Sequence, residues 1–421
     1  MQPSGNARQI KADEVRGLIR AGDTIVVGQG GAEPTLLTRT LIEEAARIGE
    51  VTVILGLTLS DSFPASVPAQ LHFASYGGLG RNSVLAKAGR LAVIPCHYSQ
   101  LPALFRKGHL RADCVLMQVA PPRHGRGYAF GAVYETYLSE AARQARVVIA
   151  EVNPNAPSIP GGELPPDLRI DALVHHDAPL VTLGAARMSE VETRVARHVA
   201  GLVPDGATIQ LGIGALPDAI LRELGGHKHL GIHSGMLTDA ALPLIESGVV
   251  DNSKKRFDAG VTVSGIFAGS EKFYRFLDGN PAFRLAPSDE THGIASLSRI
   301  PDFVSLNSAI EVDLHGQVNA EVAAGLYLGC FGGQVDFARG AAASEGGLSV
   351  IALSSTTKDG KTSRIVAGLS GPVTTSAADV DCAVTEWGVA HLKGAAFAER
   401  RRRLLAIAHP DFRAALEASS A

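Results

Sequence analysis

One stretch of sequence occurs twice in this chain. Residues 17–37 read GLIRAGDTIVVGQGGAEPTLL, and residues 201–221 read GLVPDGATIQLGIGALPDAIL. Each copy carries a Gly-Leu pair, a turn with glycine, a Thr-Ile run, a Gly-x-Gly and then a proline before an apolar segment. A repeat of this length and spacing predicts two similar halves that meet across a cleft.

Short apolar runs alternate with segments of helical character. Continuous apolar runs of this length are typical of strands buried on both faces, as in parallel sheets. The predicted strands are Thr24–Val27, Val51–Leu55, Leu91–Ile94, Cys114–Val119 and Val147–Ala150. Helices are predicted over Pro34–Ile48 and Tyr137–Ala145. The pattern predicts an α/β fold of two similar domains with mostly parallel sheets, divided into residues 1–188 and 189–421.

The composition narrows the class of protein. Hydrophobic residues make up 46% and charged residues 19% of the 421 residues, which is ordinary for a globular chain. The 39 basic and 42 acidic residues nearly cancel, and aromatic residues are 5%, so we expect no nucleic-acid partner. No apolar run reaches the ~20 residues of a membrane span, the N-terminus lacks the apolar core of a signal peptide, and no Cys-x-x-Cys pair occurs. We therefore expect a cytoplasmic protein without a membrane partner and without a bound metal.

Glycines precede a predicted helix in both copies of the repeat. They lie at Gly28–Gly31 and at Gly212–Gly214. Backbone N–H groups in such a loop can approach an anionic ligand at the positive end of the helix, although glycine also serves tight strand-to-helix packing alone. Neither copy has the full dinucleotide-binding fingerprint Gly-x-Gly-x-x-Gly, and no acidic residue follows the glycine loops in the expected βαβ context. A dinucleotide oxidoreductase is therefore a distant alternative.

Two further segments suggest ligand contacts. The Gly332-Gly333 pair in GCFGGQVDFAR favours consecutive N–H groups that form an oxyanion hole, or else a tight bend. Lys358 lies in the segment IALSSTTKDGKTSRIV, whose composition suits phosphate binding or a solvated hairpin.

These motifs together resemble the acetyl-CoA hydrolase/transferase family, of the 4-hydroxybutyrate CoA-transferase type. The segments that carry the resemblance include GATIQLGIGALPDAIL, LGIHSGMLTDAALPLIESGVVDNSKK, LNSAIEVDLHGQVNAE, GGQVDFARGAA and IAHPDFR. The resemblance implies acyl-CoA and a small carboxylic acid as substrates, no tightly bound cofactor and a homo-oligomer. It also implies a glutamate that attacks the thioester and then carries CoA as a glutamyl thioester.

The sequence departs from the family pattern at that glutamate. The family motif reads Gly-Ile-His-(Ser/Thr)-Glu-Met, and this chain has Gly235 at the position of the glutamate. The resemblance also implies an asparagine that is replaced in this chain near His292, in the segment PSDETHGIAS. Glycine has no side chain, so the covalent role cannot be filled at position 235.

Three explanations remain open for this departure. Asp61 or Glu33, in the first half, could supply the carboxylate instead, although either residue could also be a turn or helix-start carboxylate. The enzyme could hydrolyse acyl-CoA with an activated water. The chain could also bind acyl-CoA without turnover.

The contacts with CoA carry over from the resemblance position by position. Cys330 stands where the family has glycine, and we do not expect it to be a nucleophile because no histidine neighbours it in sequence. The predicted contacts are Gly212, Ile213, Gly214, Ala215, Leu216, Ile310, Cys330, Gly332, Gly333, Gln334 and Lys358.

Overall fold

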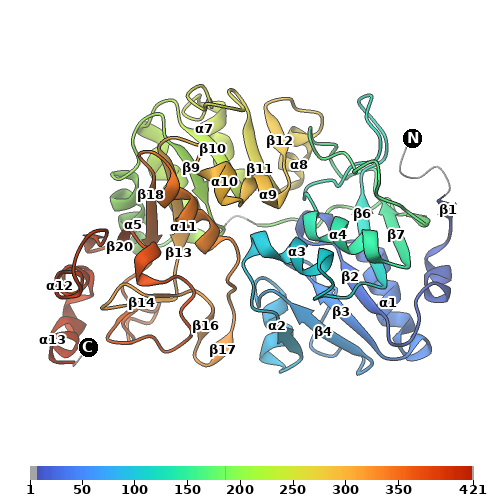
Figure 1. Ribbon diagram of the computed structural model, residues 1–421, viewed down its shortest axis with the longest axis horizontal. Helices are drawn as coiled ribbons and strands as arrows, with labels where there is room; N and C mark the ends of the chain where they lie inside the picture. The colour runs from blue at the N-terminus through green and yellow to red at the C-terminus, as the bar shows by residue number, and fades with distance from the viewer. Residues whose placement is uncertain (1–6, 185, 420–421) are drawn as a thin grey trace. The chain divides into compact units, whose positions relative to one another are not determined.

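The computed structural model describes residues 7–184 and 186–419 (Figure 1). The chain forms two compact units. One comprises Met1–Gly184 with Gly265–Ser288, and the other comprises Ala185–Ser264 with Asp289–Ala421. The division that we predict between residues 188 and 189 stays a prediction.

The first eight-stranded sheet is parallel throughout. Its order is β1-β8-β7-β6-β2-β3-β4-β5, and each neighbouring pair runs parallel. The strands are β1 (Arg8–Gln9), β2 (Thr24–Val27), β3 (Val51–Leu55), β4 (Leu71–Ser75), β5 (Leu91–Val93), β6 (Cys114–Val119), β7 (Val147–Val152) and β8 (Ala172–His175). Parallel strands of this kind are buried on both faces, and every residue of β6 and β7 is buried here.

The second eight-stranded sheet has the order β12-β11-β10-β9-β13-β18-β20-β21. Its strands are β9 (Thr208–Leu211), β10 (Gly231–Thr238), β11 (Thr262–Ala268), β12 (Phe283–Leu285), β13 (Phe303–Ser308), β18 (Leu348–Ala352), β20 (Cys382–Thr385) and β21 (Gly388–His391). The strands from β10 to β20 in this order run parallel, and β21 runs antiparallel to β20. Two small sheets consist of β14 (Glu311–Asp313), β15 (Val318–Asn319) and β19 (Ile365–Val366), and of β16 (Val322–Ala323) and β17 (Leu326–Tyr327).

The two large sheets share one topology. From β2 the chain adds β3, β4 and β5 on one side and then crosses to β6, β7 and β8 on the other. From β9 it adds β10, β11 and β12 on one side and then crosses to β13, β18 and β20. The strands β2 and β9 are the Thr-Ile runs of the sequence repeat, so the predicted duplication is confirmed at the level of the fold.

Helices connect the strands. They are α1 (Thr35–Ile48), α2 (Asn82–Lys87), α3 (Leu101–Arg106), α4 (Thr136–Gln144), α5 (Glu190–Ala200), α6 (Ala215–Glu223), α7 (Leu242–Glu246), α8 (Glu271–Leu277), α9 (Ser288–Thr291), α10 (Ile294–Leu297), α11 (Gln334–Ala343), α12 (Phe397–Ile407) and α13 (Pro410–Ala418). Helix α5 begins with a capping box, in which Ser189 and Glu192 satisfy each other's backbone N–H groups. Among the helices between residues 7 and 184 and between 186 and 419, none is long and apolar enough to cross a membrane.

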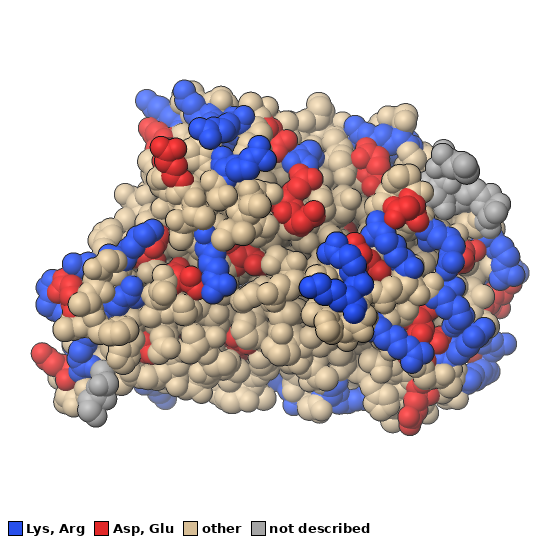
Figure 2. Space-filling view, viewed as in Figure 1, with Lys and Arg blue, Asp and Glu red and all other residues tan. Residues whose placement is uncertain are grey.

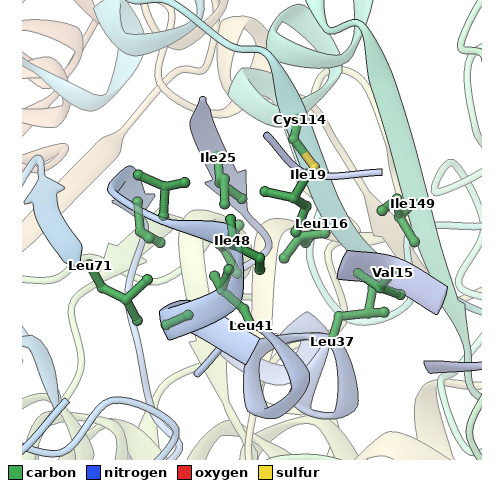
Figure 3. Close-up of a cluster of buried hydrophobic side chains, with 14 of the residues drawn as sticks. Val15, Ile19, Ile25, Leu37, Leu41, Ile48, Leu71, Cys114, Leu116 and Ile149 are labelled. Carbon is green, nitrogen blue, oxygen red and sulfur yellow. The ribbon is translucent and has the colours of Figure 1, made fainter. Parts of the chain in front are cut away.

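The core of the first unit lies between α1 and its sheet (Figure 3). Leu37 and Leu41 of α1 are fully buried, and Ile25 of β2, Leu71 of β4 and Leu116 of β6 belong to the same cluster. The helix presents these leucines at a four-residue spacing, which keeps them on one face. On the face of the molecule shown in Figure 2, basic and acidic side chains are interspersed.

Truncation of this core tests the packing. Leu37→Ala should lower the free energy of unfolding by about 2–5 kcal/mol, because Leu37 is fully buried and the change leaves a cavity. Leu326→Ala is the matched control, since Leu326 is 38% exposed and its truncation should cost less than about 1 kcal/mol. Urea denaturation of both variants measures the difference, and equal losses would contradict this account of the core.

Candidate functional site

The glycine loop of the second unit lies directly after β9. Gly214 immediately precedes α6 and has a φ of +118°, which residues with a Cβ atom rarely adopt. Gly212 and Ile213 are half-buried and Gly214 is exposed, so a ligand can reach the loop backbone. The five predicted contacts from Gly212 to Leu216 thus share one loop and the first turn of α6.

A second group of predicted residues lies where β13 ends and α11 begins. Gln334, the first residue of α11, donates from its Nε2 to the carbonyl oxygen of Ser308 at 2.8 Å and accepts a hydrogen bond from Thr375 Oγ1 at 2.9 Å. Since β13 lies beside β9, these bonds bring the start of α11 to the sheet edge where the glycine loop begins. Ile310 follows β13 at the same edge. The side chain of Gln334 therefore holds the loop in place through protein contacts.

Gly332 has to be glycine in this arrangement. Its φ is +51°, and a Cβ atom there would lie 2.8 Å from the Sγ atom of Cys330. The resemblance implies glycine at position 330. The side chain of Cys330 fits there because Gly332 has no side chain that would collide with it.

Lys358 lies apart from these loops in the chain. It is exposed on a turn after β18, between Thr356 and Ser363, which form a β-bridge. Its contact with CoA stays a prediction.

Gly235 lies within β10 and is buried. A Cβ atom at this position would lie 2.6 Å from both Cε1 and Nε2 of His292 and 3.0 Å from Cζ of Phe337. Real Cβ atoms essentially never come this close to another heavy atom. Any side chain at position 235 would therefore displace the imidazole of His292.

His292 is held between α9 and α10. It is 5% exposed, its Nδ1 lies 2.8 Å from Thr291 Oγ1, and its ring centroid lies 4.5 Å from that of Phe337. Burial, and secondarily the charge of His233, lowers the pKa of His292 to about 3. The imidazole is therefore uncharged throughout the physiological range.

Glu33 of the first unit is a buried carboxyl group. It follows the loop after β2 and is 4% exposed. Its Oε1 accepts from the backbone N–H of Leu59 at 2.6 Å and of Ser60 at 3.2 Å, and its Oε2 accepts from the Ser60 hydroxyl at 2.5 Å. Burial raises the pKa of Glu33 to about 7, while the hydrogen bonds from Ser60 and Leu59 oppose the rise. Both protonation states are therefore populated near neutral pH.

Asp61 lies in a different environment. Its side chain is 81% exposed and forms an ion pair with Arg81, whose side chain is 51% exposed. An exposed pair of this kind contributes little to stability and leaves the carboxylate solvated.

Glu135, which the sequence analysis did not single out, lies close to Glu33. It precedes α4 and is 1% exposed, and its Oε1 accepts from the backbone N–H of Gln29 at 2.8 Å. Its Oε2 is buried and has no hydrogen-bond partner in the described part of the chain. Burial raises the pKa of Glu135 to about 8; the hydrogen bonds from Gln29 oppose the rise and the charge of Glu33 adds to it. Two carboxyl groups with raised pKa values thus lie near the carboxyl end of β2.

Comparison with known proteins identifies the chain. Residues 6–182 match the acetyl-CoA hydrolase/transferase N-terminal domain, and residues 269–420 match the C-terminal domain of the same name. The 4-hydroxybutyrate coenzyme A transferase of Clostridium kluyveri is 36% identical over 413 residues, which are 97% of this chain and 96% of that protein. The chain belongs to the acetyl-CoA hydrolase/transferase family.

Two solved structures have the same fold as this chain. A 4-hydroxybutyrate CoA-transferase from Porphyromonas gingivalis is 34% identical with a TM-score of 0.81, and RipA from Yersinia pestis is 31% identical with a TM-score of 0.90. Each alignment covers 97% of this chain and 96% of the other. The two-domain α/β architecture that the sequence predicts is therefore confirmed.

Membership of the acetyl-CoA hydrolase/transferase family gives the packing around Gly235 its importance. The resemblance described above implies a glutamate at this position, and in this chain the imidazole of His292 lies where a side chain on residue 235 would begin. The sequence offered one signal for this, namely two departures from the pattern 57 residues apart. It offered no signal that the two residues touch.

A substitution tests the contact between Gly235 and His292. Gly235→Ala should lower the free energy of unfolding by about 1–3 kcal/mol, because the new methyl group collides with His292. Gly225→Ala is the matched control, because a Cβ atom there meets no heavy atom within 4 Å. Thermal unfolding compares the variants, and an unchanged melting temperature of Gly235→Ala would contradict the described packing.

The pH dependence of stability tests the environment of Glu135. Its pKa of about 8 in the folded state exceeds the ordinary value of 4.5, so the folded protein retains a proton that the unfolded chain has already lost. Stability should therefore fall as the pH rises from about 4.5 to about 8, and Glu135→Gln should remove this part of the loss. Unfolding at pH 5 and pH 9 measures it, with Glu163→Gln as a control because that side chain is 41% exposed. A variant no more stable than wild type at the higher pH would refute the assignment.

Proposed function

We propose that this chain is a CoA-transferase that moves CoA between an acyl-CoA and a small carboxylic acid, with a carboxylate outside position 235. The relative from Clostridium kluyveri, which covers nearly the whole chain, is named for this reaction. The observation that carries the proposal is the buried Glu33 carboxyl group with its raised pKa, because the reaction needs an oriented carboxylate.

The second unit would hold the acyl-CoA. The exposed backbone of the Gly212–Gly214 loop, at the start of α6, suits an anionic or amide-bearing part of CoA. The N–H groups of Gly332 and Gly333, at the start of α11, suit the developing oxyanion of the thioester. Ile310 and Cys330 lie in the flanking loops, and Lys358 would contact the nucleotide end.

Glu33 would be the nucleophile. Its carboxylate oxygen forms a bond to the thioester carbon, the C–S bond breaks, and CoA leaves as the thiolate. The thiolate then attacks the Glu33 carbonyl of the mixed anhydride and releases the first acid as its carboxylate. The acceptor acid takes CoA from the glutamyl thioester by the same two steps in reverse, which restores the carboxylate.

Glu33 fits this role better than Asp61. Two backbone N–H groups and a hydroxyl group orient the Glu33 carboxyl group, and little water solvates it. The solvated carboxylate of Asp61 pairs with Arg81, which reduces its reactivity. Asp61 stays the second candidate.

Hydrolysis is the alternative reaction. Glycine at position 235 supplies no carboxylate, so an activated water molecule would attack the thioester in place of a glutamate there. Free thiol released from acyl-CoA without any acceptor acid would support hydrolysis over transfer. Saturable binding of acyl-CoA with neither reaction would support a binding protein.

Substitution of Glu33 tests the nucleophile. Glu33→Gln should lower the rate of CoA transfer by at least about 1,000-fold, because the amide cannot attack the thioester. In wild type the rate should rise with pH through about 7 and then level off, since the ionised form of Glu33 reacts. Ser60→Ala should move this inflection to higher pH, because the Ser60 hydroxyl lowers the pKa of Glu33.

Steady-state kinetics between pH 5 and pH 9 measure these effects. Glu50→Gln is the matched control, since its side chain is 81% exposed. Full transferase activity in Glu33→Gln would exclude Glu33, and the same measurement on Asp61→Asn would then decide the second candidate.

A further inference from the structure

Trp387 is exposed at the carboxyl end of β20. It lies in the turn between β20 and β21, 43% of the residue is exposed, and it is the single tryptophan of the chain. One exposed apolar side chain is ordinary on a protein surface. The contacts of the indole ring therefore decide whether this side chain has a role.

Buried hydrogen bonds hold the indole ring in place. Its Nε1–H group donates to Ser355 Oγ at 3.1 Å. Ser355 in turn donates its backbone N–H and its hydroxyl to the carboxylate of Glu386, at 2.9 and 2.6 Å, and both residues are buried. The backbone N–H of Trp387 donates to Thr385 Oγ1 at 3.1 Å. A ring fixed in this way loses little side-chain freedom when a ligand binds to it.

Two side chains of the C-terminal segment flank the ring. The guanidinium carbon of Arg413 lies 5.8 Å from the ring centroid of Trp387, and the ring of His409 meets the indole at 89° with 5.4 Å between centroids. Arg413 is itself fixed, because it donates to the carbonyl oxygens of Ala406 and Ala408 at 2.9 Å each. Trp387, His409 and Arg413 together form an ordered aromatic platform that is partly open to solvent.

A basic hairpin begins at the serine that holds the indole. It spans residues 355–364 after β18, and the backbone N–H of Arg364 donates to the carbonyl oxygen of Ser355 at 2.8 Å. Its cations Lys358, Lys361 and Arg364 outnumber its one carboxylate, Asp359, and both lysines are exposed. Three residues of extended chain span at most about 11 Å, so the Cα atom of Lys358 lies within that distance of the serine.

The aromatic platform and the hairpin lie at the sheet edge that also carries the glycine loop. Strands β9, β13, β18 and β20 are consecutive neighbours and run parallel, so their carboxyl ends meet at one edge. The glycine loop follows β9, the hairpin follows β18 and Trp387 follows β20. Three steps between strands of about 4.8 Å each separate β9 from β20 by roughly 14 Å. A long ligand bound at the glycine loop can therefore reach the platform along this edge.

We propose that the adenine ring of CoA stacks on Trp387, with the phosphate groups of CoA at the basic hairpin. The inference rests on the proposed function, in which the second unit holds the acyl-CoA. An aromatic side chain offers a stacking surface to a base, and lysine ammonium groups are common partners of phosphate. The pantetheine arm would then run from the platform toward the glycine loop.

The emission of Trp387 tests the stacking directly, because the chain has no other tryptophan. Adenosine 3′,5′-bisphosphate carries the adenine and the 3′-phosphate of CoA but no thiol, and it should quench the emission in a saturable manner. CoA should quench the emission as well. Pantetheine, which lacks the nucleotide, should leave the emission unchanged.

Calorimetry on variants measures the contribution of the ring. Trp387→Ala should weaken the binding of CoA about tenfold, because base stacking on the indole is lost, and should not change the affinity for pantetheine. Trp387→Phe, which keeps an aromatic ring, should weaken it less than about threefold. Phe397→Ala is the matched control, since Phe397 is also an exposed aromatic residue, at 63%.

The hairpin is tested by a double substitution. Lys358→Ala/Lys361→Ala should weaken the binding of CoA about fivefold at low ionic strength and by less at high salt, because exposed charges are screened. Lys272→Ala is the matched control, since Lys272 is exposed on α8.

An emission that saturating CoA leaves unchanged, or a folded Trp387→Ala protein that binds CoA as tightly as wild type, would overturn the proposal. An emission that changes with protein concentration but not with nucleotide would indicate a second copy of the chain on the platform and would overturn it as well. A wild-type protein that binds CoA without turnover would instead contradict the proposed function, and the emission would still decide the role of Trp387. If Trp387→Ala fails to fold, the quenching in wild type decides.

Discussion

The order of the parallel strands determines where chemistry can occur in this fold. In each large sheet one strand, β2 or β9, has its successors on one side and the later strands on the other. At this strand the order of the sheet reverses, because the connections that follow run to opposite sides of it. Ligands of α/β proteins bind in the crevice outside the carboxyl ends of the strands at such a reversal. Glu33 follows β2 in the first sheet and Gly214 follows β9 in the second, so each copy of the sequence repeat places its loop at the corresponding point of its own sheet.

Strand register shows that Gly235 has a counterpart in the first unit. Thr24 of β2 pairs with Thr52 of β3, and Thr208 of β9 pairs with Gly231 of β10, so Thr52 and Gly231 are equivalent positions of the two sheets. Gly56 lies four residues after Thr52, and Gly235 lies four residues after Gly231. A Cβ atom on Gly56 would lie 2.5 Å from the hydroxyl oxygen of Tyr137 and would also collide with Gln29. In both units a polar side chain packs against a glycine at this position. The space is occupied by hydroxyl and amide groups in one unit and by an imidazole in the other.

Local sequence predicted the elements of the fold well where one pattern dominates. The predicted strands over Thr24–Val27, Val51–Leu55 and Cys114–Val119 match β2, β3 and β6, because continuous apolar runs here are buried on both faces. Strand β4 was not predicted, since its buried residues alternate with less buried ones such as His72. The small sheets of β14 to β19 depend on contacts between distant segments, which a run of residues does not encode.

The site was less predictable because it depends on burial. Glu33 and Asp61 looked equivalent in sequence, yet the loop after β3 encloses one carboxyl group with its backbone N–H groups and leaves the other in solvent. Glu135 carried no sequence signal, since its raised pKa arises from the tertiary packing of α4 against the loop after β2. The contact between Gly235 and His292 joins residues from separate elements, so a single sequence could show two departures but not their link.

Chemical trapping of the reaction intermediate tests the central claim most directly. The protein is incubated with acyl-CoA, reduced with borohydride, digested and mapped by mass spectrometry, with protein reduced in the absence of acyl-CoA as the reference. The account predicts that reduction modifies the peptide containing Glu33 and depends on acyl-CoA. An unmodified Glu33 together with a reduced carboxyl group at any other position would contradict it.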